Sequence, residues 1–332
     1  MRAGLPYLLV FGWGMFFSVS ISISSAHWLG MWAGAELNLI MFIPFLIYTG
    51  LVSETESAMK YFIFQAIGSG FMVFGSVMTY SMTHSWELIT DIHVNWMLFV
   101  GLMVKLGAAP FHWWLPPVMA GVKWPVAFIL TTWQKIIPLF LVCTLLGPDS
   151  WQPLVMFLSV ASGFIGGIGG VNQTQFRALI AYSSIGHIGW MLYSMSFSLG
   201  SMVIYFLFYV AISAALFREL WNMASSGTLD TSGNHSVMVN LGIMVSLVSM
   251  GGLPPMVGLF PKWLIFIGAW GTAHYMVILL LILGSLISIY YYLCVVFSLI
   301  MIFKGKGYHD ACLVLVAILA NIVLGVLCMF LF

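Results

Sequence analysis

Long runs of apolar residues, separated by short polar or Gly/Pro-rich segments, dominate the chain. Runs of this length predict membrane-spanning helices, because one span needs about 20 apolar residues. The expected spans cover residues 4–21, 28–48, 57–80, 94–111, 125–146, 151–171, 176–194, 199–223, 237–271, 274–302 and 311–331. The pattern therefore predicts an all-α polytopic membrane protein with about 11 transmembrane helices.

Two apolar stretches are too long for one straight span. Residues 237–271 would form a helix of about 50 Å, whereas the hydrocarbon core of a bilayer is about 30 Å thick. The Gly-Gly-Leu-Pro-Pro sequence at 251–255 predicts a break there. A second break is expected in residues 94–122, at Gly107, Pro110, Pro116 and Pro117. Irregular backbone at membrane depth persists where it is buried in protein or lines a wet cavity, so two discontinuous helices indicate a transport route.

Composition excludes several classes of protein. Only 6% of the residues are charged, against about a quarter in a soluble domain, so a water-exposed globule is excluded. The formal net charge is +1, which offers neither a basic surface for nucleic acid nor an acidic tail. The four cysteines form no CxxC pair and lie in apolar stretches, which is typical of buried small hydrophobes.

The distribution of cations predicts the orientation. With about 11 spans, every second connection lies on the side of the N-terminus. That side contains all the Lys and Arg of the connections: Arg2, Lys60, Lys123, Arg177, Arg218, Lys304 and Lys306. The opposite connections contain no Lys or Arg, and their acidic residues are Glu87, Asp91 and Asp149. The positive-inside rule therefore places the N-terminus inside and the C-terminus outside.

Four charged residues lie inside predicted spans: Glu36, Lys105, Lys135 and Lys262. Each costs about 2.5–3.5 kcal/mol at the bilayer centre unless it faces protein, a partner charge or water. Desolvation disfavours the charged form of such groups and pairing restores it, so a buried Glu–Lys pair titrates as one coupled system. This chemistry suits a proton relay. The alternative is a purely structural role, in which the charges only hold helices together.

His187 lies mid-span between small residues and either passes protons along or bonds a neighbouring serine. The glycine-rich run at 163–170 follows no strand, so close helix packing is favoured over a nucleotide loop. The chain also has no HExxH sequence, no CxxCH sequence and no phosphate loop. We therefore expect no redox centre on this chain.

Several motifs resemble one known family. They are Lys105-Leu-Gly-Ala-Ala-Pro-Phe-His-Trp-Trp-Leu-Pro-Pro, Trp133-Gln-Lys-Ile-Ile-Pro138, Ala178-Leu-Ile-Ala-Tyr-Ser-Ser-Ile-Gly-His187 and Gly252-Leu-Pro-Pro-Met-Val-Gly-Leu-Phe-Pro-Lys-Trp263. Their order and spacing resemble the subunit 2 family of NADH dehydrogenase, an antiporter-like membrane subunit of animal mitochondrial respiratory complex I. The resemblance extends over most of the chain, from about Glu36 to Trp263.

The resemblance implies one transmembrane domain over residues 1–332, built from two inverted helical repeats with one discontinuous helix each. The first repeat would cover about 1–150, truncated at its N-terminus relative to the bacterial form, and the second about 151–332. The inside face would be the mitochondrial matrix, so that the N-terminus lies in the matrix and the C-terminus in the intermembrane space of the inner membrane.

The resemblance also implies residue roles. Glu36 and Lys105 correspond to the carboxylate–lysine pair of the first half-channel, and Lys135 to the central lysine. Lys262 corresponds to the lysine of the second broken helix, and His187 to a histidine on the polar axis between them. One departure concerns Lys262, because other antiporter-like subunits often have a glutamate in the last half-channel. Protons would then pass laterally to a neighbouring subunit.

The implied activity is that of a subunit of proton-translocating NADH:ubiquinone oxidoreductase. No cofactor is expected on this chain, and FMN, iron–sulfur clusters and ubiquinone are expected on other subunits. The expected partners are the other membrane-arm subunits, including neighbouring antiporter-like ones, together with lipids and without nucleic acid. Two alternatives are a stand-alone cation/proton antiporter of the same ancestry and a passive membrane scaffold.

Overall fold

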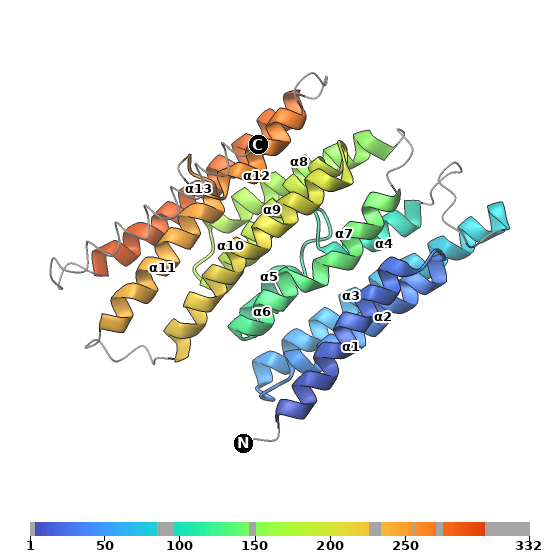
Figure 1. The fold of residues 1–332 in the computed structure, drawn as a ribbon, viewed down its shortest axis with the longest axis horizontal. Helices are drawn as coiled ribbons and strands as arrows, with labels where there is room; N and C mark the ends of the chain where they lie inside the picture. Colours follow the sequence, from blue (N-terminus) through green and yellow to red (C-terminus); the bar gives the residue numbers. More distant parts are fainter. Residues whose placement is uncertain are drawn as a thin grey trace. The chain divides into compact units, whose positions relative to one another are not determined.

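The computed structural model describes residues 4–84, 86, 96–145, 151–225, 234–254, 256–269 and 275–302, and these ranges contain helices and turns without a β-strand. The helices (Figure 1) are α1 (Gly4–Ser24), α2 (Trp28–Leu46), α3 (Val52–Thr83), α4 (Trp96–Leu106), α5 (Leu115–Gly121), α6 (Trp124–Thr131), α7 (Trp133–Leu145), α8 (Gln152–Val171), α9 (Phe176–Met195), α10 (Leu199–Ser225), α11 (Asn234–Gly251), α12 (Leu259–Gly268) and α13 (Tyr275–Ile302). The predicted all-α class is confirmed for the described residues.

Six helical segments are long and apolar enough to cross a membrane. They are Trp28–Leu46, Val52–Ser81, Trp124–Leu145, Gln152–Val171, Leu199–Ala224 and Tyr275–Met301. Shorter apolar helices account for parts of other expected spans. The expected span at 311–331 lies outside the described residues, so the count of about 11 remains a prediction.

Both predicted breaks are present. Helix α4 ends at Leu106 and α5 begins at Leu115, while α11 ends at Gly251 and α12 begins at Leu259. Each break starts with a glycine in the left-handed region, with φ of +71° at Gly107 and +78° at Gly252. Other residues rarely adopt this conformation, so glycine at these positions allows the chain to leave the helix at once.

Two boundaries differ from the prediction. The expected span at 125–146 is interrupted at Thr132, which separates α6 from α7. The Thr132 hydroxyl donates to the carbonyl of Phe128 at 2.7 Å, and local bonding of this kind competes with the helical ladder. Helix α3 begins at Val52 and not near 57, so Glu54 lies inside the helix.

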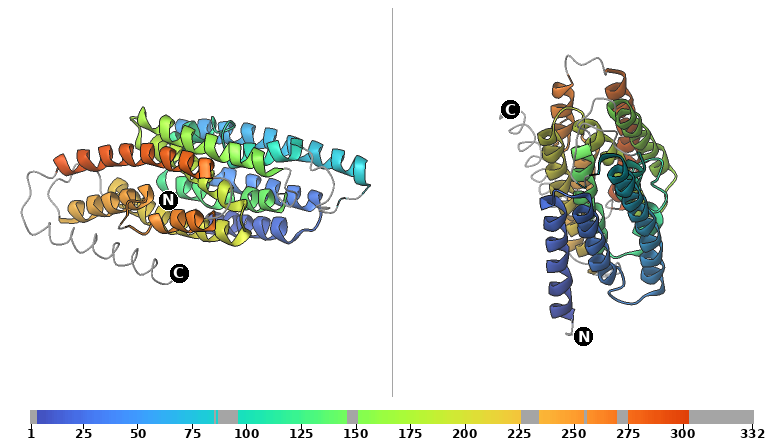
Figure 2. Two further views of the ribbon diagram at one scale, coloured as in Figure 1. Left: turned by 90° about the horizontal axis from the view of Figure 1, so that it is seen from above. Right: turned by 90° about the vertical axis from the view of Figure 1, so that its right-hand side faces the viewer.

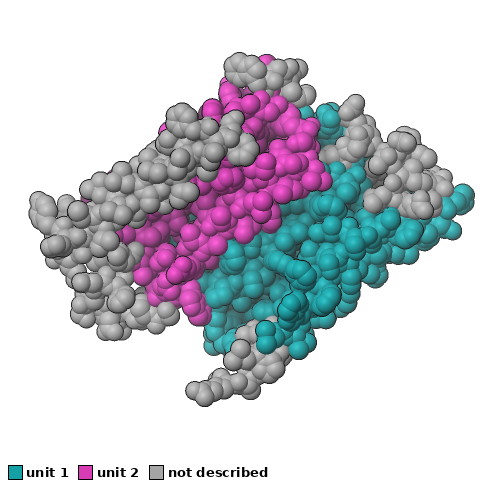
Figure 3. Space-filling view, viewed as in Figure 1, with its two compact units in different colours: residues 1–158, 174–181 teal, residues 159–173, 182–332 magenta. Residues whose placement is uncertain are grey.

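The helices form two compact units (Figure 3). Unit 1 contains residues 1–158 and 174–181, and unit 2 contains residues 159–173 and 182–332. Within unit 1, α2 packs between α1 and α3, and α3 also packs on α4 and α5. Within unit 2, α11 packs on α10 and α13. Figures 1 and 2 show α1, α2 and α3 side by side. The division into inverted repeats at about residue 150 remains a prediction.

Most helices bury only one face within the chain. For α13, 28% of the apolar window is buried, and for α10 the share is 33%. Large apolar side chains on the other faces are exposed, among them Leu207, Leu279 and Leu286. In hydrocarbon such faces need no cover, and the helical backbone satisfies its own polar groups. The buried faces therefore contain the polar residues on which the candidate site is built.

Candidate functional site

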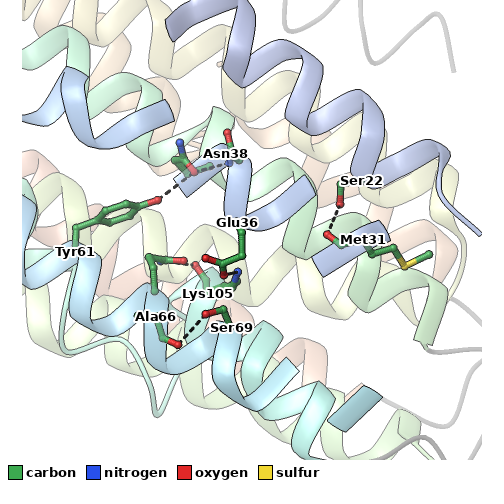
Figure 4. A network of polar contacts seen from close by, with 10 residues as sticks. Ser22, Met31, Glu36, Asn38, Tyr61, Ala66, Ser69 and Lys105 are labelled. Carbon is green, nitrogen blue, oxygen red and sulfur yellow. Dashed lines mark hydrogen bonds and ion pairs between the residues drawn. The ribbon is translucent and has the colours of Figure 1, made fainter. Parts of the chain in front are cut away.

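The first part of the candidate site is an ion pair at the first helix break. Lys105, in the last turn of α4, extends its ammonium to within 3.3 Å of Oε1 of Glu36 on α2 (Figure 4). The lysine side chain is 6% exposed and the glutamate side chain 24%. Gly68 on α3 leaves room for the lysine stem, since a Cβ there would lie 3.0 Å from Lys105 Cγ. The predicted pairing of Glu36 with Lys105 is thus present in unit 1.

The backbone around this break is held by side chains. The last carbonyls of a helix lack helical donors and need other partners. The indole of Trp114 donates to the carbonyl of Val104 at 3.0 Å, and the amide of Gln65 on α3 donates to the carbonyl of Lys105 at 3.3 Å. The end of α4, and with it the lysine, is therefore fixed from two sides.

A cluster of neutral polar groups lies beside the ion pair. Asn38 on α2 and Tyr61 on α3 point toward each other (Figure 4), and both donate to Oε1 of Gln134 on α7, at 2.7 and 3.2 Å. A cavity of about 20 Å³ is lined by these three residues together with Gln65 and Lys105. A water molecule needs about 10–15 Å³ and two to four polar partners, so the cavity has room for one.

Lys135 is 2% exposed and lies in the first turn of α7, directly after Gln134. Its backbone N–H donates to the carbonyl of Thr132 at 3.1 Å. The interruption between α6 and α7 therefore fixes the position of the Lys135 backbone. A long side chain that is buried to this extent in a membrane helix faces protein and not lipid. Of the surroundings that sequence analysis left open for Lys135, the structure thus shows protein, and the role of Lys135 remains a prediction.

Unit 2 contains the remaining predicted residues. The Lys262 ammonium, in the first turn of α12, donates to the carbonyl of Gly251 at 2.8 Å and lies 5.8 Å from the ring centre of Trp190. A ring nitrogen of His187 lies 2.9 Å from the hydroxyl of Tyr205. His187, Trp190 and Lys262 line one cavity of about 20 Å³. The structure thus brings His187 and Lys262 to the same cavity, at the second helix break.

The glycine-rich run on α8 packs helices closely around this cavity. A Cβ at Gly166 would lie 2.4 Å from the backbone nitrogen of Gly186 on α9, and one at Gly167 would lie 2.8 Å from the carbonyl oxygen of Gly284 on α13. The predicted packing role of this run is confirmed, because real Cβ atoms do not approach backbone this closely.

Three predicted inside connections meet at one end of unit 1. The Lys123 ammonium, in the turn between α5 and α6, lies 3.8 Å from Oε1 of Glu54 at the start of α3. Arg177 at the start of α9 donates to the carbonyl of Ala120 at 3.1 Å. Their common location fits the positive-inside assignment, although the membrane face that they occupy remains a prediction. Other residues of that assignment lie outside the described residues: Arg2, Glu87, Asp91, Asp149, Lys304 and Lys306.

Sequence reasoning assigned no role to Asn38, Tyr61, Gln134 and Glu54. These four polar residues lie within or next to long apolar runs, where an amide, phenol or carboxylate needs a hydrogen-bond partner. That position could have indicated that they contact other polar groups. For Glu54 the signal was also the helix start, because an acid in the first turn faces unsatisfied backbone N–H groups.

Comparison with known proteins places the chain among membrane subunits. The sequence profile of a family described as NADH:quinone oxidoreductase/Mrp antiporter, transmembrane, matches residues 25–288. The NADH-ubiquinone oxidoreductase chain 2 of Lumbricus terrestris is 36% identical over 85% of this chain and 83% of its own length.

Two solved structures share the fold. A chain of respiratory complex I from Thermus thermophilus, with bound aureothin, superposes with a TM-score of 0.80 at 23% identity, covering 98% of this chain and 79% of that one. A chain of the Mrp complex from Dietzia sp. superposes with a TM-score of 0.76 at 16% identity, covering 84% and 58%. At these identities the likeness concerns the fold alone.

Proposed function

Because the chain belongs to the NADH:quinone oxidoreductase/Mrp antiporter transmembrane family, among the chain 2 subunits of NADH-ubiquinone oxidoreductase, we propose that it translocates protons in the membrane arm of respiratory complex I. Its partners are the other membrane-arm subunits, including neighbouring antiporter-like ones, and lipids. Its location is the mitochondrial inner membrane, with the N-terminus in the matrix and the C-terminus in the intermembrane space.

The ion pair between the buried Lys105 and the partly buried Glu36 is the observation that carries this proposal. A charged side chain at the centre of a bilayer costs about 2.5–3.5 kcal/mol when no protein group, partner charge or water offsets it. The Lys105 ammonium and the Glu36 carboxylate are 3.3 Å apart, so the protonation of one sets the charge state favoured by the other. Such a pair takes up or releases a proton when a nearby charge changes, which is the elementary step of a relay.

The relay continues from this pair through Lys135 to His187 and Lys262. Electron transfer from NADH to ubiquinone takes place on other subunits, and its effect reaches this chain as a change of charge. Moving one charge across 100 mV requires about 2.3 kcal/mol. A pKa shift of one or two units corresponds to about 1.36 kcal/mol per unit, which is of the same size. Changes in the protonation of coupled side chains can therefore supply the energy needed to move one charge.

The two halves of the chain are inverted repeats in this proposal. Support comes from the recurrence of one local arrangement, a lysine at a helix break that starts with a left-handed glycine. Lys105 precedes Gly107 in the first half, and Lys262 follows Gly252 in the second. The repeats cover about 1–150 and 151–332, with about 11 spans in total.

Replacing Lys135 or Lys262 with alanine tests the relay. We expect the complex to assemble and to retain its electron carriers, while proton uptake per NADH oxidised falls at least about twofold, because lost proton-transfer groups slow their steps by about 10² to 10⁴ fold. The measurement is proton uptake by liposomes containing the assembled complex. Lys60→Ala is the control, since Lys60 is exposed and pairs with exposed Glu56. Native proton uptake in both buried-lysine variants would refute the proposal.

A second candidate function is cation/proton exchange without partners, and it is favoured by the matching family, whose description includes the Mrp antiporter. Proteoliposomes that contain the purified chain alone distinguish the two. The relay proposal predicts no exchange of Na⁺ or K⁺ for protons in response to an imposed pH gradient. Exchange abolished by Lys105→Ala would support the antiporter instead. A passive scaffold would tolerate paired replacement of Glu36 and Lys105 by apolar residues without loss of pumping.

A further inference from the structure

One face of α3 is polar and buried over residues 54–65, in the first half of the helix. Its residues are spaced three or four apart and therefore lie on one side. They are Glu54, Ser57, Tyr61 and Gln65, with exposed fractions of 2%, 3%, 1% and 6%. The opposite side is apolar and exposed, with Met59 at 60%, Phe62 at 48% and Ile63 at 55%. This row of four residues, the α3 polar row, is thus enclosed in unit 1 on a helix whose opposite side is exposed.

The first end of the α3 polar row lies where two turns meet. Glu54 accepts hydrogen bonds from the backbone N–H of Thr49, at 2.9 Å, and from the Thr49 hydroxyl in the α2–α3 turn. The ammonium of Lys123 lies 3.8 Å from the same carboxylate, and the lysine side chain is 38% exposed. Glu54 is therefore buried itself but adjoins a cation that reaches the surface of the chain.

The other end of the α3 polar row lies at the ion pair. Gln65 donates to the carbonyl of Lys105, and the Tyr61 hydroxyl donates to Gln134. Both Tyr61 and Gln65 line the cavity that Lys105 also lines. From Glu54 to Gln65 the helix rises by about 16 Å, which is about half the thickness of the hydrocarbon core. The row thus joins an end of unit 1 to the buried Glu36–Lys105 pair.

The middle of the α3 polar row is kept clear by glycine. A Cβ at Gly121, the last residue of α5, would lie 2.1 Å from the hydroxyl oxygen of Ser57 and 2.7 Å from the carbonyl oxygen of Ser53. Any side chain at position 121 would occupy the space of the Ser57 hydroxyl. Because position 121 is glycine, α5 packs against the row and still leaves space for the Ser57 hydroxyl.

We propose that Glu54 is a proton-accepting residue and that the α3 polar row is the route by which protons reach the Glu36–Lys105 pair. This inference rests on the proposed relay function. The Glu54 carboxylate takes one proton from the aqueous face and becomes a carboxylic acid. It then releases that proton to the row, where each hydroxyl or water accepts one proton and donates another. The Lys105 amine or the Glu36 carboxylate accepts the last proton, so no bond other than O–H and N–H changes.

A structural role for Glu54 makes different predictions. The two oxygens of the Glu54 carboxylate accept separately from the Thr49 N–H and the Thr49 hydroxyl, which holds the α2–α3 turn. A glutamine at position 54 keeps one accepting oxygen and loses both the second acceptor and the ion pair with Lys123. Thr49→Val removes the hydroxyl contact of the turn and keeps the acid. A structural role therefore predicts that Thr49→Val and Glu54→Gln both lower the ratio, whereas proton transfer predicts that only Glu54→Gln lowers it.

The test uses the complete complex assembled with variant chains in liposomes, and measures proton uptake per NADH oxidised. We expect Glu54→Gln to lower this ratio at least about twofold, because the amide cannot take up the proton. We expect Glu54→Asp to restore most of the ratio and Thr49→Val to leave it unchanged. Glu56→Gln is the matched control, since it is the same exchange two residues away on the exposed side of α3.

The outcomes separate this inference from the relay function. A lowered ratio in Glu36→Gln together with a native ratio in Glu54→Gln would overturn the route and leave the relay standing. Native ratios in both would overturn the relay as well. Should Glu54→Gln fail to assemble, Ser57→Ala decides the question, because it removes a hydroxyl in the middle of the row. A native ratio in Ser57→Ala would then overturn the proposed route.

Discussion

A methionine in place of Lys105 is expected to abolish proton translocation and to lower the amount of assembled complex. The substitution keeps the length of the side chain but leaves the Glu36 carboxylate without its cation. Removing one partner of a buried ion pair costs about 3–5 kcal/mol. Since the Glu36 side chain is 24% exposed, we expect a value near the lower end, about 3 kcal/mol. Native gel electrophoresis measures assembly, and liposome assays measure proton uptake.

The double variant Glu36→Gln with Lys105→Met separates stability from function. It removes both charges, so no carboxylate is left unpaired, and paired removal of buried charges is often neutral or stabilising. Assembly should therefore recover to near the native amount, while proton translocation should stay absent. A double variant that pumps at the native ratio would contradict the role of this pair.

Replacing Gly258 with alanine is expected to destabilise the second helix break and with it the folded subunit. A Cβ at Gly258 would lie 1.6 Å from the carbonyl oxygen of Ser249, which is backbone and has no rotamer that avoids it. Overpacking of a well-packed core costs about 1–3 kcal/mol, and here the helix end itself must move. We expect a loss of about 3 kcal/mol or more, measured as the temperature at which the purified complex loses this subunit.

Gly268→Ala provides the matched control for this variant. Gly268 ends α12, ten positions after Gly258, and a Cβ there would meet no heavy atom within 4 Å. The same exchange should leave the dissociation temperature unchanged. Equal effects of the two variants would indicate that glycine is needed for backbone freedom in general, and not for the contact with Ser249.

Much of the fold follows from hydrophobic pattern and helix-breaking residues. The breaks after Leu106 and Gly251 were predictable because an apolar stretch longer than the bilayer must bend, and glycine and proline are where it bends. The pairing of Glu36 with Lys105 was predictable from the cost of isolated charge in hydrocarbon. These inferences need only the thickness of the membrane and the chemistry of the residue.

The remaining features depend on contacts between segments far apart in the chain. Gln134 on α7 accepts hydrogen bonds from Asn38 on α2 and Tyr61 on α3. No local sequence pattern predicts a contact between residues so far apart in the chain. Glu54 fell between the expected spans 28–48 and 57–80, because the polar sequence Ser-Glu-Thr-Glu at 53–56 separates two apolar runs. In the structure this sequence forms the first turn of α3, where acids are favoured, and Thr49 and Lys123 lie within reach of Glu54.

The acceptor that holds Lys262 differs in kind from that of Lys105. Lys105 is paired with the negatively charged carboxylate of Glu36, whereas Lys262 donates to the carbonyl of Gly251, which is a neutral dipole. Among the described residues that line the Lys262 cavity, none is acidic. An uncompensated cation in a medium of low permittivity is sensed over longer distances than a neutral pair. We therefore expect a charge introduced close to the second helix break to affect Lys262 more than the same charge at the same distance affects the paired Lys105.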